Sequence, residues 1–448
     1  MTECLFFVKS VTFYFSIFLN KYQIACEFFN NSYVNKNGVK FLTMVLNLLF
    51  LILLLGLLIF ITGKDLYRNS IYEGPFWFSI VLLGWFIPKY FSMMGKDNSS
   101  IFLAYVFLCT SFFIFAFRIN VNFNFKQRYL DGKYLNIWLI FTSVIGLIAY
   151  VKARSVLDVY QELHGGHLTG FITILFFLSK LLVINFAVSF NNFLNKRNIT
   201  AIIYMLPSLL YFLDRIFIYG RRETLLTLVL IILTLLYFKT NFLLKRALLV
   251  PCVIFGAVII STVGQYRYVM ENDLPLSEYS PLEGFTDSAN TDHSNEVLIA
   301  TKKINFIWDN DMYDMYLSLW DRVIHSYFPG QIFGAGLKKS LTFSYNQVTT
   351  DMLSGTYSSG MTSTGFVDSF QAFSFFGFMI FFLIGVLLKR VWNQALHGRE
   401  LAIILYPLLL SKSLFTITHS SAHFFLELIS FYVFFGFYYL CTASREVV

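Results

Sequence analysis

The sequence LDRIFIYGRRE, at residues 213–223, carries five charged residues between two strongly apolar runs at 201–212 and 224–238. Charged side chains within or beside a lipid bilayer are costly, so they are usually paired with one another and usually mark a functional site. We therefore interpret this stretch as part of a binding site for an anionic ligand, at a point where two membrane spans meet.

The composition of the chain is that of a membrane protein. Of the 448 residues, 57% are hydrophobic and only 13% are charged, whereas about one quarter of the residues in a soluble protein are charged. Apolar runs of about 18 to 22 residues recur along the chain, and each is long enough to cross a hydrocarbon layer of ~30 Å. These features predict an all-α polytopic membrane protein.

The apolar runs predict eleven membrane-spanning helices, and a weaker apolar segment at 5–19 would make twelve. A polar segment at 265–368 is too long to be a passive connection between helices. We therefore expect an N-terminal bundle at 1–264, a large outer loop at 265–368 and three C-terminal spans at 369–448. The expected spans lie at 42–62, 76–94, 100–117, 135–151, 169–190, 200–219, 224–239, 247–264, 370–388, 400–418 and 424–441.

Lysine and arginine are distributed unevenly over the loops. One set of alternating loops holds fifteen of them and the other set holds five, and cytoplasmic loops are the ones that are enriched. The first set is therefore expected inside, with the C-terminus, while the turn at 220–223 and the large loop face outward. Arg221 and Arg222 then oppose the usual bias, which favours a functional role. The alternatives are an interfacial snorkelling pair, or a salt bridge from either arginine to Glu223 or Asp214.

The large outer loop differs in composition from the inner loops, because it carries thirteen acidic residues against six lysines and arginines. Residues 304–328 have apolar side chains at helical spacing, which predicts a helix lying against the membrane domain. Arg322 lies late in that segment, and Arg267 lies just past the end of the preceding span. Gly334 and Gly336 then allow a tight turn or a close approach of the backbone.

A family resemblance rests on three features that occur together. The chain has many spans, an outward Gly-Arg-Arg-Glu at the start of a helix at 220–223, and one large outer loop near the C-terminus. That loop contains an arginine, the turn PGQIFGAG at 329–336, and the polar stretch STGFVDSF at 363–370, which leads into a span with Phe-Gly-Phe at 376–378. In this arrangement the chain resembles the Wzy-type polymerases of O-antigen and oligosaccharide repeat units and, more distantly, the O-antigen ligases. The likeness is architectural over most of the chain and local at 213–224, 321–336 and 363–378.

The resemblance implies a GT-C-like helical fold in a bacterial inner membrane, with the active face in the periplasm. It implies a glycosyl transfer in which the donor is a growing glycan on undecaprenyl diphosphate and the acceptor is one lipid-linked repeat unit. It also implies that the reaction uses no metal and no other cofactor, and that a chain-length regulator protein is a further partner. We expect no nucleic acid as a partner.

The residues that would hold a diphosphate follow from its chemistry. Guanidinium groups bind phosphate in a bidentate manner and stay charged, and the N–H groups at a helix N-terminus favour an anion. We therefore expect the diphosphate at Arg221, Arg222 and Arg322, with Arg215 and Arg267 as second candidates. The acceptor hydroxyl calls for a general base, for which the candidates in falling order are Asp368, Glu223 and His419.

Two other functions remain as alternatives to the polymerase. An O-antigen ligase is expected to carry a histidine where the large loop re-enters the membrane. This chain has Thr364, Gly365 and Asp368 there, and no histidine occurs between His325 and His397, which favours a polymerase. A flippase for lipid-linked oligosaccharide would more naturally show internal repeats, and the sequence shows none.

The remaining polar residues in apolar surroundings have less specific interpretations. Lys180 and Lys412 lie deep inside apolar runs, so we expect each to bind phosphate or a buried carboxylate. His419 and His423 flank the last outer turn, where they either cap helices at the interface or face the site. A histidine pair at 164 and 167 and the five cysteines show no metal-ligand spacing, so we expect no metal site.

Overall fold

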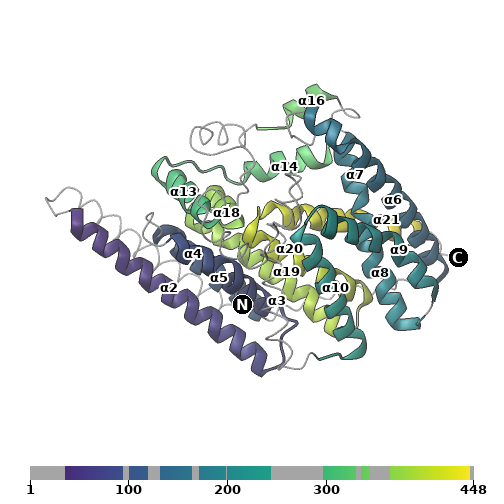
Figure 1. Ribbon diagram of the computed structural model, residues 1–448, viewed down its shortest axis with the longest axis horizontal. Coiled ribbons are helices and arrows are strands. Elements are labelled where there is room, and N and C mark those ends of the chain that lie inside the picture. The colour runs from purple at the N-terminus through teal and green to yellow at the C-terminus, as the bar shows by residue number, and fades with distance from the viewer. Residues whose placement is uncertain are drawn as a thin grey trace, which may run out of the picture.

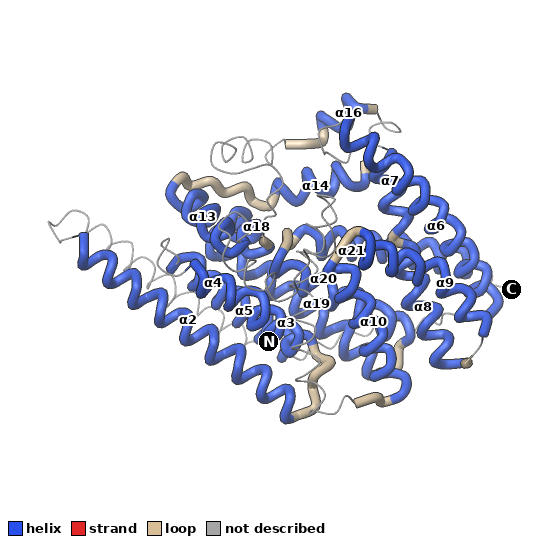
Figure 2. The backbone as a smooth tube through the Cα atoms, in the orientation of Figure 1, coloured by secondary structure: helices blue, strands red, loops and turns tan. Residues whose placement is uncertain are grey.

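The computed structural model describes residues 36–93, 100–119, 132–163, 171–197, 199–243, 296–328, 334–343 and 364–443. Figure 2 shows these residues as helices joined by short connections, with no strand among them. The expected span at 247–264, the weak segment at 5–19 and Arg267 lie outside the described residues.

The described part of the chain contains nine helical segments that are long and apolar enough to cross a membrane, together with a shorter apolar helix at Ala422–Tyr438. These ten segments coincide with ten of the spans expected from the sequence, and they confirm a polytopic α-helical membrane protein. The first seven comprise α2 (Lys36–Tyr67), α3 (Gly74–Val81), η1 (Leu82–Phe86), α4 (Ile87–Met93), α5 (Ser100–Arg118), α6 (Gly132–Leu163), α7 (Phe171–Ser179), α8 (Leu181–Lys196), α9 (Ile199–Leu213), η2 (Asp214–Ile218) and α10 (Arg222–Thr240).

The C-terminal part adds three spans and three helices that lie between the two groups of spans in the chain. The spans comprise α18 (Gly365–Phe373), η5 (Ser374–Gly377), α19 (Phe378–Leu396), α20 (Glu400–Thr418) and α21 (Ala422–Ala443). The other three helices are α13 (Glu296–Asp309), α14 (Leu317–Tyr327) and α16 (Ala335–Ser340). Figure 1 shows α13, α14 and α16 along one side of the bundle, which we call the upper end.

Ion pairs and hydrogen bonds show which helix ends lie together. At the upper end, Lys89 of α4 pairs with Glu296 at the start of α13 at 2.9 Å. At the opposite, lower end, Arg118 at the end of α5 pairs with Glu73 before α3 at 3.2 Å. Because successive spans alternate in direction, α10, α18 and α21 begin at the upper end and α20 ends there.

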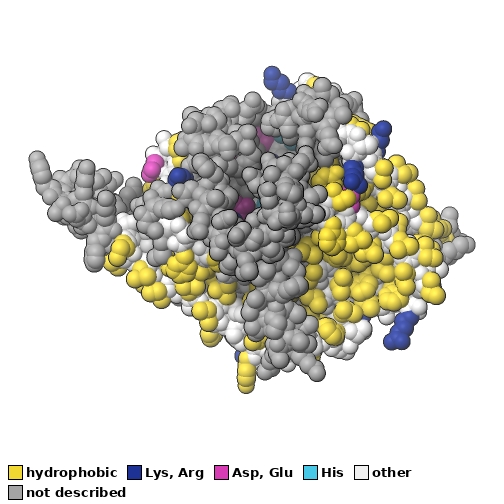
Figure 3. Space-filling view, in the orientation of Figure 1, with side chains coloured by type: hydrophobic (Ala, Val, Ile, Leu, Met, Phe, Trp, Pro, Cys, Tyr) yellow, Lys and Arg dark blue, Asp and Glu magenta, His cyan; other side chains and the backbone are white. Residues whose placement is uncertain are grey.

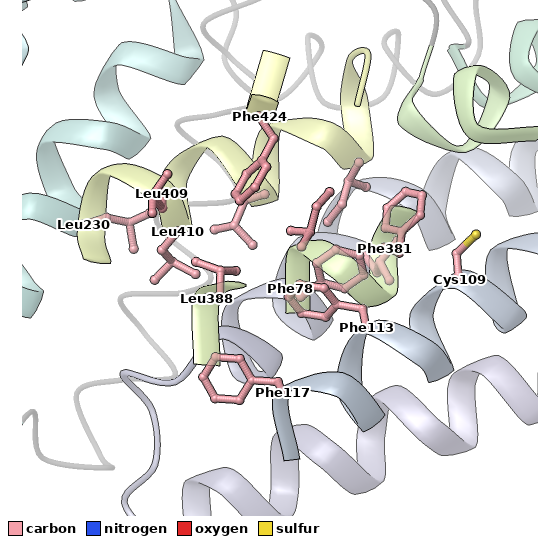
Figure 4. Close-up of a cluster of buried hydrophobic side chains, with 14 of the residues drawn as sticks. Phe78, Cys109, Phe113, Phe117, Leu230, Phe381, Leu388, Leu409, Leu410 and Phe424 are labelled. Carbon is pink, nitrogen blue, oxygen red and sulfur yellow. The ribbon is translucent and has the colours of Figure 1, made fainter. Parts of the chain in front are cut away.

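Close approach of α5 and α19 forms the centre of the bundle, and it depends on a glycine. An added Cβ at Gly385 would lie 2.6 Å from the carbonyl oxygen of Phe113, so only glycine lets the two backbones come this close. Around this contact Phe78 stacks on Phe113 with ring centroids 4.1 Å apart, and Phe381 stacks on Phe366 at 4.9 Å. Figure 4 shows this cluster of buried side chains.

The outer surface of the bundle is apolar, as a lipid-facing surface must be. Many large hydrophobic side chains on α2, α6 and α9 are exposed, and Figure 3 shows hydrophobic side chains covering the surface over these helices. The buried side of the same helices packs against the centre, so each helix is apolar on both sides. This pattern explains why the sequence shows continuous apolar runs instead of amphipathic ones.

Two expected helices are interrupted, and both differences have a backbone cause. The segment at 304–328, expected as one helix, is divided between α13 and α14, because Asp311, Met315 and Tyr316 adopt left-handed backbone angles between them. The span expected at 370–388 begins earlier, as α18, and is broken at Ser374, which has a φ of 53°. After this break the chain passes close to α18, and an added Cβ at Gly377 would lie 1.8 Å from a carbonyl oxygen.

Candidate functional site

The turn between α9 and α10 places two arginines at the start of a helix. The π-helical segment η2 ends α9, and Gly220 with a φ of 58° then reverses the chain, which is a conformation that favours glycine. The backbone N–H of Arg221 donates to the carbonyl oxygen of Arg215 at 2.9 Å, and α10 begins at Arg222. The helix start expected from the sequence is therefore confirmed, and with it an anion-favouring N-terminus.

Asp214 and Arg215 are neighbours in sequence but have different partners. Asp214 pairs with Arg154 of α6 at 2.6 Å and accepts a hydrogen bond from the hydroxyl group of Tyr150. The guanidinium of Arg215 lies 5.6 Å from the ring centroid of Tyr219, and its Nε is buried without a hydrogen-bond partner among the described residues. The charge of Asp214 is therefore balanced from α6, and Arg215 packs against the turn.

A chain of four alternating charges lies beside this turn. Lys412 of α20 pairs with Glu223 in the first turn of α10 and with Glu427 of α21 at 3.3 Å. Lys180, at the break between α7 and α8, pairs with the same oxygen of Glu427 at 2.8 Å. Of the two partners expected for these lysines, phosphate or a buried carboxylate, the structure shows the carboxylate for both. Glu427 was not singled out from the sequence, although a lone acid in the apolar run at 424–441 is a signal of the same kind.

The second part of the site joins α14 to α18. Nη1 of Arg322 lies 3.3 Å from Oδ2 of Asp368, in the first turn of α18, where the Thr364 hydroxyl accepts a hydrogen bond from the Val367 N–H. Lys303 of α13 lies within electrostatic range of both charges: burial lowers the pKa of its ammonium group, and Asp368 opposes that effect. Arg322 and Asp368, selected separately from the sequence, therefore face each other.

Hydrogen bonds at both ends of α14 fix the helix that carries Arg322. Before its first turn, the backbone N–H of Asp314 donates to the Gln371 carbonyl of α18 at 3.0 Å, and the Asp314 carboxylate accepts from the Tyr316 N–H at 2.9 Å. Burial raises the pKa of Asp314. At the far end, the Tyr327 hydroxyl lies 2.8 Å from the Ser430 hydroxyl on α21. Figure 1 shows α14 lying across the upper end between α13 and α7.

Two histidines connect the two parts of the site. The ring of His419 stacks on Phe415 with centroids 3.9 Å apart, and its Nδ1 lies 2.8 Å from the Thr418 hydroxyl. Burial lowers the pKa of His419, as do Arg221 and Arg222, while Glu296 and Glu223 oppose the shift. His419 is therefore neutral near pH 7, the form that accepts a proton.

His423, in the first turn of α21, links the two parts. It lies within electrostatic range of Glu223 and Lys412 on one side and of Arg322 on the other. Its ring also packs against Phe415, with centroids 5.6 Å apart. Through His423, the charge chain of α10, α20 and α21 and the Arg322–Asp368 pair of α14 and α18 lie within electrostatic range at the upper end. We call these residues, together with His419 and the turn at 220–223, the upper-end site.

The structure brings together most of the residues that were expected to act. The turn at 220–223, Arg322, Asp368 and His419 all belong to the upper-end site, whereas Arg267 lies outside the described residues. Sequence reasoning missed Glu427, Lys303 and Arg154. Lys303 and Arg154 gave no signal of their own, because each lies in a stretch with other charges, where a solvated position is the ordinary interpretation.

The chemistry available at the upper-end site is anion binding next to proton acceptance. Arginine and lysine side chains and the N-terminus of α10 favour a phosphate group, while Asp368, Glu223 and His419 are possible proton acceptors. Within the described ranges, no group of three or more His, Cys, Asp or Glu residues is arranged to hold a metal ion. Comparison with protein-family models, curated proteins and solved structures finds no match.

Proposed function

We propose that this chain is a glycosyltransferase that polymerises lipid-linked oligosaccharide repeat units on the outer face of a bacterial inner membrane. The donor is a growing glycan on undecaprenyl diphosphate, and the acceptor is the non-reducing end of an incoming lipid-linked repeat unit. The observation that carries the proposal is the contact of Arg322 of α14 with the buried Asp368 of α18, at the end of the bundle where α10 begins with Arg222. A lipid diphosphate is an anion held at a membrane surface, which is the ligand that such a site fits.

The arginines account for binding and for stabilisation of the leaving group. The diphosphate lies at the N-terminus of α10 against Arg221 and Arg222, and Arg322 reaches it from α14. Negative charge develops on the diphosphate oxygen as the glycosidic bond breaks, and fixed positive groups lower the energy of that charge. Arg215 is a second contact, because its buried Nε has no acceptor among the described residues.

The transfer step requires one bond to form and one to break. The acceptor hydroxyl oxygen bonds to the anomeric carbon of the donor sugar, and its proton passes to the carboxylate of Asp368. The bond between that carbon and the diphosphate oxygen breaks, and undecaprenyl diphosphate leaves with the electron pair. Glu223 and His419 are the second and third candidates for the proton acceptor, and Glu223 is already engaged by Lys412.

The contact between Arg322 and Asp368 couples binding to this step. Nη1 of Arg322 donates a hydrogen bond to the Asp368 carboxylate, and a diphosphate competes for the same guanidinium. When the guanidinium turns to the diphosphate, the carboxylate loses its partner and becomes a better proton acceptor. Asp368 is therefore restrained until the donor is bound.

Deletion of the gene followed by analysis of the surface glycan tests the proposal. Loss of the polymerase should leave single repeat units attached to the surface lipid, with no longer chains. Complete loss of attached glycan would instead indicate a ligase or a flippase, and would overturn the proposal. In the purified protein, Arg322→Lys should retain only part of the activity with lipid-linked repeat units, because lysine lacks the planar fork of arginine.

A further inference from the structure

Glu427 is the most buried member of the charge chain that runs from Lys180 to Glu223. Its side chain is 8% exposed, whereas that of Lys412 is 17% exposed and that of Lys180 is 34% exposed. Both lysines contact the same oxygen, Oε1, at 2.8 Å and 3.3 Å. Glu427 is thus an acid whose ion-pair partners are two lysines, and neither lysine is a candidate catalytic residue.

The four members of this chain come from four different places in the bundle. Lys180 lies at the break between α7 and α8, Lys412 on α20, Glu427 on α21 and Glu223 in the first turn of α10. Lys412 is the only member that contacts both carboxylates. Lys412 therefore links Glu427 to the first turn of α10, where Glu223 follows Arg221 and Arg222.

We propose that Glu427 is a positioning residue of the upper-end site: it holds Lys412 against Glu223 and thereby fixes the first turn of α10, with Arg221 and Arg222. Glu427 acts through Lys412 and does not touch the substrate. Without Glu427, the ammonium group of Lys412 keeps one carboxylate partner and gains freedom to move away from the first turn. The effect on glycosyl transfer rests on the proposed function, whereas the effect on α10 does not.

A second contact between α10 and α20 supplies a matched control. One turn further along α10, the hydroxyl group of Thr227 lies 2.5 Å from that of Ser411 on α20. Thr227→Val removes this buried contact, and with it the hydrogen bond that the Thr227 hydroxyl donates to the Glu223 carbonyl oxygen at 2.8 Å, but it removes no charge. If the charge chain served only to hold α10 against α20, then Thr227→Val and Glu427→Gln would have the same consequences.

A double variant separates charge balance from position. Glu427→Gln alone leaves Lys180 without its carboxylate, which would lower the stability of the fold because a charge without a partner inside a membrane span is costly. Adding Lys180→Gln makes the chain neutral again, and Lys412 still pairs with Glu223. We expect the double variant to recover native abundance and thermal stability while the first turn of α10 remains loosened.

Amide hydrogen exchange of the protein in lipid nanodiscs tests whether the first turn of α10 is loosened, and it needs no substrate. The amides of Thr224 and Leu225 donate to the Arg221 carbonyl at 3.1 Å and 3.3 Å, so they report on the first turn of α10. Their exchange should be roughly tenfold faster in Glu427→Gln and in the double variant, since a charge-assisted contact holding the turn is lost. In Thr227→Val the exchange of these two amides should stay within roughly twofold of the native rate.

Turnover on lipid-linked repeat units provides the second measurement. The double variant should lose roughly tenfold or more in kcat with native abundance, as expected for a misplaced binding group. Native exchange at Thr224 and Leu225 in the double variant would overturn the proposal, as would equal loosening in Thr227→Val. If the native protein shows no glycosyl transfer while the exchange results hold, the proposed function fails and the positioning role of Glu427 stands.

Discussion

Replacement of Asp368 by asparagine should change ligand binding and turnover in opposite directions. Asparagine has nearly the same shape and can still accept a hydrogen bond from Arg322, but it carries no charge. An anion then competes for the guanidinium against an amide instead of a carboxylate, so it should bind more tightly. Turnover should fall, because the amide cannot accept the proton of the acceptor hydroxyl.

The size of the binding effect follows from the geometry of the pair. Two unit charges 3.3 Å apart attract by about 5 kcal/mol at an effective dielectric constant of about 20. The Arg322 side chain is 31% exposed and that of Asp368 only 7%, so screening at the arginine and desolvation of the carboxylate offset most of this attraction. A net coupling of about 1–2 kcal/mol is left, which corresponds to roughly a 5- to 30-fold change in affinity.

Two measurements on the purified protein in nanodiscs check this prediction. Titration with inorganic pyrophosphate should show a lower dissociation constant for Asp368→Asn than for the native protein. Chain synthesis from lipid-linked repeat units should be slower by a factor of about 10²–10⁴, the usual contribution of a general base. Glu296→Gln is the matched control, because it also removes one carboxylate at the upper end, but one that pairs with Lys89.

The two measurements can fail separately. Unchanged or weaker pyrophosphate binding in Asp368→Asn would refute the competition between this carboxylate and the ligand for Arg322. Unchanged chain synthesis would refute the role of Asp368 as the proton acceptor, and would direct attention to Glu223 or His419. Equal effects in Glu296→Gln would show that the overall charge of the upper end, and not the individual contact, controls binding.

Three further predictions concern other positions. Arg222→Ala should shorten the glycan chains seen on gels. Arg222→Lys should restore the chain length only in part, because lysine lacks the planar fork of arginine. Normal chain lengths in both variants would contradict the assignment of Arg222 to the diphosphate. Gly377→Ala should destabilise the protein by about 3 kcal/mol or more, because the added Cβ would lie 1.8 Å from the Ser369 carbonyl oxygen. Gly56→Ala, with nothing within 4 Å of the added Cβ, should be neutral or stabilising by up to about 1 kcal/mol, and thermal unfolding compares the two. Burial lowers the pKa of His419, so the folded chain binds this proton less readily than the unfolded chain, and stability should fall as the pH drops below about 6.5. His419→Gln should reduce that fall in unfolding scans between pH 7.5 and pH 5, and an identical pH dependence would contradict the prediction.

The membrane spans could be predicted from sequence because their signal is strong and local. A bilayer requires an apolar run of a fixed length, and the run at 100–117 shows this whatever the rest of the chain does. The interruptions could not be predicted in the same way. The apolar spacing at 304–328 continues across the break at 310–316, and Ser374, which has a left-handed backbone angle, lies inside the run expected as one span at 370–388.

The candidate site was partly predictable for a related reason. A charge inside an apolar run stands out by itself, so Lys180, Lys412 and Arg221 could be selected from the sequence alone. Their partners could not be assigned, because partners come from distant positions in the chain. Asp214 illustrates this, since the sequence offers neighbouring arginines as its partner, whereas the structure supplies Arg154 from α6 at 2.6 Å.

Charge pairs at the lower end serve as a comparison for those at the upper end. There, Arg118 contacts Asp65 at 2.5 Å and Glu73 at 3.2 Å, one cation between two acids. These three residues join α2, α5 and the start of α3, so the contact fixes helix ends that follow closely in the chain. A structural role accounts for it fully.

The upper end differs in the origin of its members. Its ion pairs join Lys180 and Lys412 to Glu427, Lys412 to Glu223, and Arg322 to Asp368, and so connect helices from several distant parts of the chain. Arg221 and Arg222 stand at the N-terminus of α10, where a positive side chain opposes the helix dipole, so formation of the helix alone gives no reason to place them there. An anion at this position would interact favourably with the arginines and with the helix start, and the proposed lipid diphosphate would supply that charge.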